Sequence, residues 1–231
     1  MYYNICQVVR KMNILKKTLM IISIAIISFI IIISVSYNII TNYKLKNIKV
    51  HDQNIVFYGD SITEGYNVKE FFDEENVVNS GISGNVTKNL IDRIDTDLYD
   101  YNPSLVIILI GTNDINTNVD DKTIIDNIEK IIKGIRMNRK NADIMIESIY
   151  PINREMNTEY WDNKPDYTNE HIIKLNKSIK KMCKKYNIKY IDVYSCLLDD
   201  QGNLKKIYSI DGLHLTDLGY YKVTKVIKKY I

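Results

Sequence analysis

Acidic side chains are absent from the first fifty residues of this 231-residue chain, a stretch that contains seven lysines and arginines. Subtracting these 7 from the 31 basic residues of the chain leaves 24 against 28 acidic residues, so residues 51–231 carry a net charge of about −4. The overall charge of +3 therefore comes from the N-terminal segment. The larger part of the chain lacks the basic balance typical of nucleic-acid-binding proteins, and we expect no nucleic-acid partner.

Cysteine is also scarce: the chain has Cys6, Cys183 and Cys196, and their spacing does not suggest a zinc site. Cys183 falls in a lysine-rich predicted helix, where a small packing residue is the expected role. A Cys183–Cys196 bridge is the alternative if this part of the chain lies outside the cell. No cluster of residues resembles a metal site, and no glycine-rich phosphate cradle occurs. We therefore expect no metal and no cofactor.

One long apolar run without charge, LMIISIAIISFIIIISVS, occupies residues 19–36. It approaches the roughly 20 residues that a helix needs to cross a bilayer. We therefore divide the chain into a basic N-terminal segment (1–18), a transmembrane anchor or signal-peptide core (19–36), a polar tether (37–53) and a folded domain (54–231).

The orientation of this run is predicted from its flanks. A short basic N-terminus ahead of an apolar core is the pattern of exported proteins, so we expect a membrane-anchored protein with its large domain outside the cytoplasm. The alternative is secretion after cleavage near Ser36, where a small-x-small triplet ends the run. The start itself is open, since Met12 begins a second plausible N-terminus.

Beyond the tether, short apolar runs alternate with segments of helical period. The expected strands are 54–58, 76–79, 104–110, 142–149 and 189–194. The expected helices lie around 90–98, 124–135, 172–186 and 220–227, the last of them capped by Thr216. This alternation predicts an α/β fold with a parallel sheet between two layers of helices, a three-layer αβα sandwich of flavodoxin-like order.

Polar clusters follow the predicted strands. They are Gly59-Asp60-Ser61, the run 79–84, Gly111–Asp114 and Asp211–His214. In a parallel sheet, functional residues gather at the carboxyl ends of the strands, so we expect these clusters to lie at one edge. Together they supply a nucleophile, a base with a nearby carboxylate and donors for an oxyanion.

These clusters resemble the sequence blocks of the GDSL or SGNH hydrolases. GDSIT is similar to the first block, NSGISGN to the second, GTND to the third and DGLH to the fifth, in the family's order over residues 55–220. The fourth block is not clear. The resemblance implies the SGNH hydrolase fold and a serine ester hydrolase.

The family's roles fall on particular residues of this chain. The resemblance implies that Ser61 is the nucleophile, that His214 is its base and that Asp211 orients the imidazole, which is the chemistry a weakly nucleophilic hydroxyl requires. It also implies an oxyanion hole formed by the backbone N–H groups of Ser61 and Gly84 and by the amide of Asn113. Gly81 is then a turn residue.

The remaining polar residues have simpler expected roles. His51 lies in the tether, and His171 lies on a helix, where a solvated or structural role is expected. We expect Asp60 to stabilise a turn and Asp114 to order the third-block loop.

The segment 150–167 is long, polar and aromatic, and loops of this kind often set specificity. Tyr150, Tyr160 and Trp161 are candidates to line a substrate groove. The alternative is that they pack this loop onto the sheet.

The sequence thus predicts cleavage of small acyl esters through an acyl-enzyme. O-acetyl groups on carbohydrate or cell-envelope polymers are the first candidates, by family analogy. The alternatives are an acyltransferase with the same triad, a lysophospholipase or thioesterase, and a binding module without activity. The sequence leaves the oligomeric state open.

Overall fold

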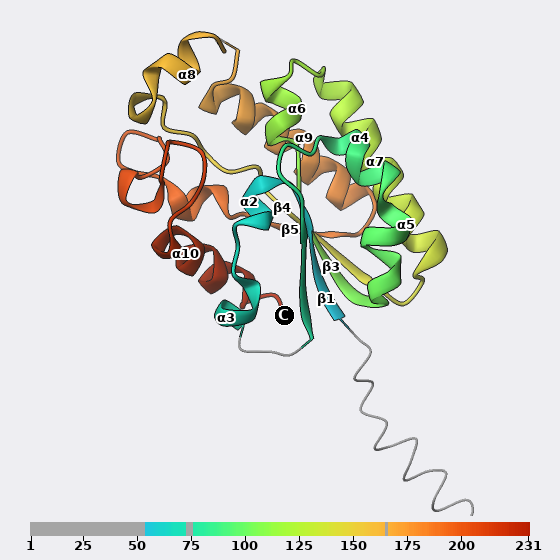
Figure 1. Cartoon of the computed structure of the whole chain (residues 1–231). Helices are drawn as coiled ribbons and strands as arrows, with labels where there is room; N and C mark the ends of the chain where they lie inside the picture. Colours follow the sequence, from blue (N-terminus) through green and yellow to red (C-terminus); the bar gives the residue numbers. More distant parts are fainter. Residues whose placement is uncertain (1–53, 73–75, 165) are drawn as a thin grey trace, which may run out of the picture. The chain divides into compact units, whose positions relative to one another are not determined.

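Five parallel strands form one sheet with the order β2-β1-β3-β4-β5 (Figure 1). The strands are β1 (Asn54–Gly59), β2 (Val77–Gly81), β3 (Pro103–Leu109), β4 (Asp143–Glu147) and β5 (Lys189–Ile191). The computed structural model describes residues 54–72, 76–164 and 166–231. The expected segments 1–18, 19–36 and 37–53 lie outside these residues. Within the described ranges, no helix is both long and apolar enough to span a bilayer.

Helices connect the strands. The α-helices are α2 (Ser61–Glu64), α3 (Val68–Phe72), α4 (Thr87–Asp92), α5 (Ile94–Asp97), α6 (Thr112–Asn116), α7 (Asp121–Asn138), α8 (Thr158–Asp162), α9 (Asn169–Lys185) and α10 (Asp217–Ile227). Short 3₁₀ turns are η1 (Tyr99–Tyr101), η2 (Arg154–Met156), η3 (Tyr194–Leu197) and η4 (Lys206–Tyr208).

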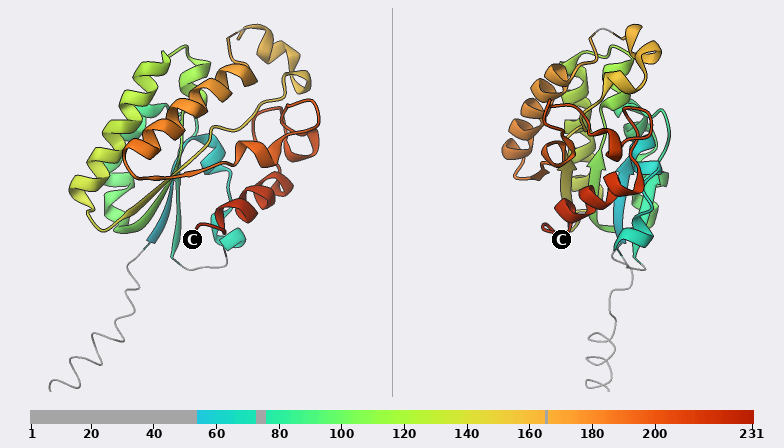
Figure 2. Two further views of the ribbon diagram at one scale, coloured as in Figure 1. Left: turned by 180° about the vertical axis from the view of Figure 1, so that it is seen from behind. Right: turned by 90° about the vertical axis from the view of Figure 1, so that its left-hand side faces the viewer.

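The helices form one layer on each face of the sheet (Figures 1 and 2). Helices α4, α5, α7 and α9 cover one face, and α3 and α10 cover the other. The isoleucine stripe of α7, from Ile124 to Ile135, is fully buried on the side of the helix that faces the sheet. The residues of β3 from Leu105 to Leu109 are also buried, because helices cover this central strand on both faces. The predicted αβα sandwich is confirmed.

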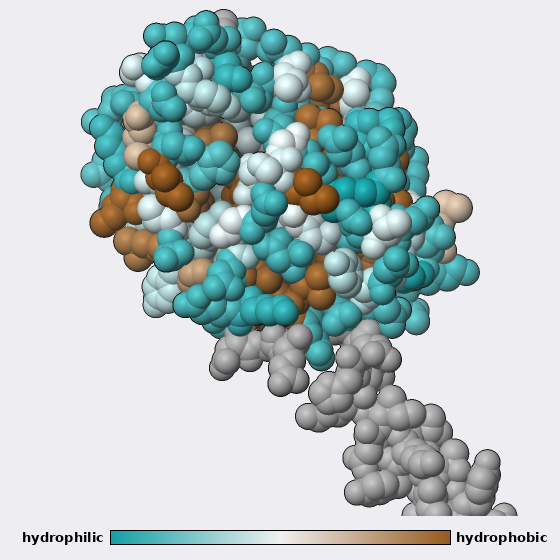
Figure 3. All heavy atoms as spheres, viewed as in Figure 1, coloured by the Kyte–Doolittle hydropathy of each residue, from teal (hydrophilic) through white to brown (hydrophobic). Residues whose placement is uncertain are grey.

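The face of the domain seen in Figure 3 is mainly hydrophilic. Apolar side chains appear there as separate small patches among polar ones. Such scattered exposure is normal for a folded domain, whose apolar surface is mostly inside.

Strand register brings the functional edge together. Gly59 at the end of β1 pairs with Gly81 at the end of β2 and with Leu109 at the end of β3. Gly81 closes its strand and is not the turn residue we expected. A Cβ there would lie 2.1 Å from the backbone nitrogen of Glu64, so glycine permits α2 to pack closely against β2.

Several helices and strands begin or end at residues other than those predicted from the sequence. The helix expected over 90–98 is two short helices, because the backbone leaves helical geometry at Arg93. The last strand ends at Ile191, where the carbonyl accepts a bond from Val193 N–H in a turn. The cap on α10 is confirmed, since Thr216 Oγ1 accepts a hydrogen bond from Gly219 N–H at 3.3 Å.

Candidate active site

Three side chains from two distant parts of the chain form a hydrogen-bonded line. Ser61 Oγ lies 3.0 Å from His214 Nε2, although 153 positions separate the two residues. His214 Nδ1 lies 2.7 Å from Asp211 Oδ2. All three side chains are partly exposed, so solvent and small molecules reach them. The structure therefore brings together the serine, histidine and aspartate predicted from the sequence.

Ser61 is the first residue of α2, directly after β1. The turn is fixed by Asp60, whose Oδ1 accepts a hydrogen bond from Ile62 N–H at 3.0 Å and caps the helix. From the neighbouring strand, the Asn79 amide donates to the carbonyls of Thr63 and Tyr66 at 2.7 and 2.8 Å. The nucleophile candidate thus sits on a short helix that is tied at both ends.

The Asp60 carboxyl is fully buried. Its second oxygen, Oδ2, has no hydrogen-bond partner among the described residues. Burial disfavours the charged form and raises the pKa of Asp60 to about 7, although the bond from Ile62 N–H and the nearby His214 act in the opposite direction. The turn-stabilising role expected for Asp60 is present as a helix cap.

The loop that carries His214 is built around the Asp211 carboxylate. Asp211 Oδ1 accepts hydrogen bonds from the backbone N–H groups of Leu213 and His214 at 2.9 and 2.8 Å. Partial burial would raise the pKa of Asp211, but hydrogen bonds from the His214 ring and from these two N–H groups lower it overall. Asp211 is therefore held as a carboxylate that accepts the His214 Nδ1–H.

Gly84 and Asn113 lie on adjoining loops at the same edge. Gly84 has a φ of +76°, a conformation that favours glycine, and the space where a Cβ would stand has no heavy atom within 4 Å. Asn113, in the first turn of α6, donates from Nδ2 to the carbonyl of Asn85 at 3.0 Å. The amide has a second N–H, which a bound oxyanion can accept.

Two of the three aromatic residues considered for a substrate groove are buried. Tyr150 and Trp161 are 3% and 1% exposed, so their rings pack in the core, as in the alternative stated for this loop. Tyr160 is only partly buried, against the edge of the Trp161 ring. Of the three, Tyr160 alone has appreciable surface to offer a substrate.

Tyr150 has a buried hydrogen-bond partner. Its hydroxyl donates to Glu147 Oε2 at 2.6 Å at the end of β4. Burial raises the pKa of Glu147 to about 7, with the Asp60 carboxyl adding to the shift and the Tyr150 hydroxyl opposing it. The buried carboxyls of Asp60 and Glu147 therefore both have raised pKa values and lie close enough to influence each other.

The other candidates take structural positions. His171 Nε2 pairs with Asp121 Oδ1 at 2.6 Å, which links α9 to α7. The carboxylate of Asp114 accepts bonds from Thr87 N–H and Oγ1, which links α6 to the start of α4.

Cys183 and Cys196 are free thiols, so the alternative of a bridge is not realised in this structure. Among the residues that the structure describes, no group of three or more acidic, histidine or cysteine side chains is placed to hold a metal ion.

Arg93 is the polar residue at this edge that the sequence did not single out. Its guanidinium donates to Asn85, beside Gly84, and to the carbonyl of Gly59, two residues before Ser61. The available signal was a charged residue between Leu90 and Ile94, inside an otherwise apolar helical stripe.

A serine hydroxyl, a histidine and an aspartate in line at the carboxyl edge of a parallel αβα sheet define the class of serine hydrolases. Residues 57–222, which include all of the site residues above, match the GDSL-like Lipase/Acylhydrolase family. The chain belongs to this family and is a GDSL-type esterase.

Three relatives illustrate the similarity. Platelet-activating factor acetylhydrolase IB subunit alpha2 of Rattus norvegicus is 24% identical over 189 residues, which cover 79% of this chain and 78% of the relative. A solved structure described as "a putative platelet activating factor from Streptococcus pneumonia" is 31% identical with a TM-score of 0.71, and the match covers 85% of this chain and 98% of that chain. A GDSL-like lipase from Bacteroides thetaiotaomicron VPI-5482 is 25% identical with a TM-score of 0.68, covering 78% and 87%.

Proposed function

We propose that the protein hydrolyses small acyl esters in two steps through an acyl-enzyme on Ser61. The observation that carries this proposal is the hydrogen-bonded line from Ser61 Oγ through the His214 ring to Asp211, with distances of 3.0 and 2.7 Å. These distances lie within the range for a nucleophile and its base.

The first step forms the acyl-enzyme. His214 Nδ1–H donates to the Asp211 carboxylate, which leaves Nε2 without a proton and able to accept one. As Ser61 Oγ attacks the acyl carbon, its proton passes to Nε2. The same proton then goes to the departing alcohol oxygen as the ester C–O bond breaks. Asp211 stabilises the imidazolium in between.

The oxyanion of each tetrahedral intermediate needs hydrogen-bond donors. The proposed donors are Ser61 N–H, Gly84 N–H and the second N–H of the Asn113 side chain. The open space beside Gly84 supports this assignment, since an acyl group has room there. The bond from Asn113 to Asn85 also supports it, because it holds the amide against the loop that carries Gly84.

Water completes the second step. His214 Nε2 takes a proton from water, the resulting hydroxide equivalent attacks the acyl carbon, and the proton returns to Ser61 Oγ as the acyl–enzyme bond breaks. The products are a carboxylic acid and the free enzyme.

Acetyl esters are the proposed substrates, with O-acetyl groups on carbohydrate or cell-envelope polymers as the specific candidates. The name of the Rattus norvegicus relative, an acetylhydrolase, supports the acetyl group. The partly exposed ring of Tyr160 supports a sugar, since aromatic faces suit sugar rings. Burial raises the pKa of the Tyr160 hydroxyl, and the Asp211 carboxylate lies close enough to add to this rise.

Nitrophenyl esters of increasing chain length test the proposal. The purified protein should hydrolyse the acetyl ester fastest, and Ser61→Ala should abolish the activity. Ser178→Ala is the matched control, because Ser178 lies on α9 and its hydroxyl donates to the Lys174 carbonyl within that helix. Retention of activity by Ser61→Ala would refute the mechanism, and a preference for long chains would refute the acetyl assignment.

The location of the domain is a separate proposal. The apolar run at 19–36 supports a membrane anchor with residues 54–231 outside the cytoplasm. A reporter fused after residue 231 should be accessible at the cell surface. A reporter found in the cytoplasm would overturn this placement.

A further inference from the structure

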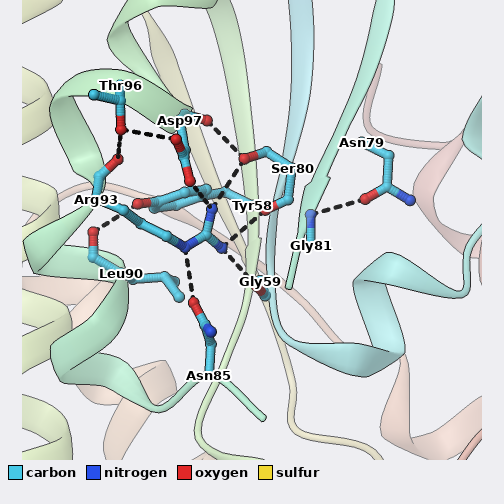
Figure 4. Close-up of polar contacts among 10 residues, drawn as sticks. All are labelled: Tyr58, Gly59, Asn79, Ser80, Gly81, Asn85, Leu90, Arg93, Thr96 and Asp97. Carbon is cyan, nitrogen blue, oxygen red and sulfur yellow. Dashed lines mark hydrogen bonds and ion pairs between the residues drawn. The ribbon is translucent and has the colours of Figure 1, made fainter. Parts of the chain in front are cut away.

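The guanidinium of Arg93 is almost completely enclosed, with 12% of the side chain exposed. Each of its five N–H donors can be matched with one of five acceptor atoms around it (Figure 4). Nε donates to Asn85 Oδ1 at 2.8 Å, one terminal nitrogen donates to Ser80 Oγ and Asp97 Oδ2 at 3.2 Å each, and the other donates to the Gly59 and Ser80 carbonyls at 2.9 Å each.

These acceptors belong to the chain segments that carry the proposed catalytic groups. Gly59 ends β1 and precedes Ser61 by two residues. Ser80 lies near the end of β2, and Asn85 directly follows Gly84. One planar side chain therefore links the strand before the nucleophile to the loop that supplies a proposed oxyanion donor.

The same loop has a second attachment, to Asn113. Asn85 receives Arg93 Nε–H on its side-chain oxygen and Asn113 Nδ2–H on its backbone carbonyl, at 2.8 and 3.0 Å. Asn85 is thus held between Arg93 and Asn113. Without the hydrogen bond from Arg93, Asn85 would be less constrained. Gly84 N–H and the Asn113 amide, which both adjoin Asn85, would then be held less firmly.

We propose that Arg93 is a positioning residue that holds Gly84 N–H and the Asn113 amide at the correct distance from Ser61. This inference rests on the proposed function of the same site. Arg93 does not touch the reacting atoms; it acts through Asn85 and through the carbonyl of Gly59.

A lysine cannot replace this arrangement. Lysine has three donors on one nitrogen, whereas the five acceptors around Arg93 are spread around a planar fork. The guanidinium also lies 4.5 Å from the centre of the Tyr58 ring, whose hydroxyl donates to the Leu90 carbonyl at 2.6 Å. Asp97 supplies the compensating charge one helical turn away. The fork, the ring and the carboxylate together fix the direction in which Nε–H points at Asn85.

Arg93→Lys, Asn85→Ala and the double variant test the inference. Asn85→Ala removes only the acceptor of Nε and leaves the other four bonds of Arg93, so it tests the link even if Arg93→Lys folds poorly. Arg139→Lys is the matched control. Arg139 also lies over a tyrosine ring, 5.1 Å from the centre of Tyr99, and donates to backbone carbonyls, but it follows α7 at the opposite edge of the sheet.

The readout is kcat per active serine. A phosphonate that reacts with catalytic serines titrates the folded sites, and kcat for nitrophenyl acetate is divided by that number. A purely structural role would lower the number of titrated sites and leave the rate of each one unchanged.

Arg93→Lys and Asn85→Ala should each lower kcat per site by about 10- to 100-fold, approaching the loss of one oxyanion donor. KM should change by less than about threefold, because the affected contacts act in the transition state. The double variant should be no slower than the slower single variant, and Arg139→Lys should keep the wild-type kcat.

Two results would overturn this inference and leave the proposed function intact. A wild-type kcat per site in Arg93→Lys, or multiplied losses in the double variant, would show that Arg93 does not act through Asn85. If the wild-type protein neither hydrolysed esters nor reacted with the phosphonate, the proposed function would fail and this inference with it. An active wild type with a fully active Arg93→Lys would refute the inference alone.

Discussion

Replacing Asp60 with asparagine should change how the stability of the protein depends on pH. The Asp60 carboxyl caps α2 through Ile62 N–H, yet it is fully buried and its Oδ2 has no hydrogen-bond partner among the described residues. Asparagine keeps the capping oxygen and removes the group that ionises. The substitution therefore isolates the free-energy cost of ionising a buried carboxyl group next to Ser61.

The sign and size of the effect follow from the pKa of Asp60, which burial raises from 3.8 to about 7. In the unfolded chain the carboxyl loses its proton near pH 4, whereas in the folded protein it keeps the proton to about pH 7. The unfolded state is therefore favoured increasingly as pH rises between these values, and the effect is constant above pH 7. At about 1.4 kcal/mol per pKa unit, the folded state loses up to about 4 kcal/mol in total, of which about 2–3 kcal/mol falls between pH 5 and pH 8.

Urea unfolding of the wild type and Asp60→Asn at pH 5 and pH 8 measures this effect. The variant should gain about 2–3 kcal/mol relative to the wild type between the two pH values. Asp120→Asn is the matched control, because Asp120 caps α7 through Thr123 N–H at 2.9 Å but is exposed and has a lowered pKa. The Asp120 carboxylate makes its full contribution to stability above pH 5. The difference in unfolding free energy between Asp120→Asn and the wild type should therefore be the same at pH 5 and at pH 8. An equal pH dependence in Asp60→Asn and the wild type would refute the argument.

Three further variants test other parts of the site. Asn113→Ala should lower kcat by about 10²–10³-fold with a small change in KM, since it removes one proposed oxyanion donor; unchanged kcat would remove Asn113 from that role. Tyr150→Phe should lower the free energy of unfolding by about 1–3 kcal/mol in urea, because it leaves the buried Glu147 carboxyl without its 2.6 Å donor; unchanged stability would contradict this. Gly84→Ala should cost about 1–2 kcal/mol of stability, because its φ is +76° while its Cβ meets no neighbour. A loss well above this range in thermal or urea unfolding would indicate a clash that the structure does not contain.

The sequence was sufficient to predict the sheet and the meeting of the polar clusters. Parallel strands joined by helices place all their carboxyl ends at one edge, so residues 153 positions apart, Ser61 and His214, could be expected as neighbours. The stripe of α7 and the unbroken apolar run of β3 are long enough for their periodicity to identify them.

Features that depend on side-chain packing could not be predicted in the same way. Tyr150 and Trp161 are polar-tipped aromatic residues, one in a loop and one in the five-residue helix α8, and their sequence pattern does not distinguish burial in the core from a place in a groove. Arg93 has no motif of its own, and its role depends on five acceptors contributed by β1, β2, the following loop and α5. Helices of four or five residues, such as α2 and α8, are too short to produce a periodic signal.

The proposed mechanism requires that an acyl group is transferred to Ser61 before water releases it. Rapid acid quenching of the purified protein during hydrolysis of nitrophenyl acetate, followed by mass spectrometry of its peptides, tests this directly. The proposed mechanism predicts one acetyl group on the peptide that contains Ser61, and none on the same peptide from Ser61→Ala. An active enzyme whose Ser61 peptide is never acetylated, or a Ser61→Ala variant with wild-type turnover, would contradict it.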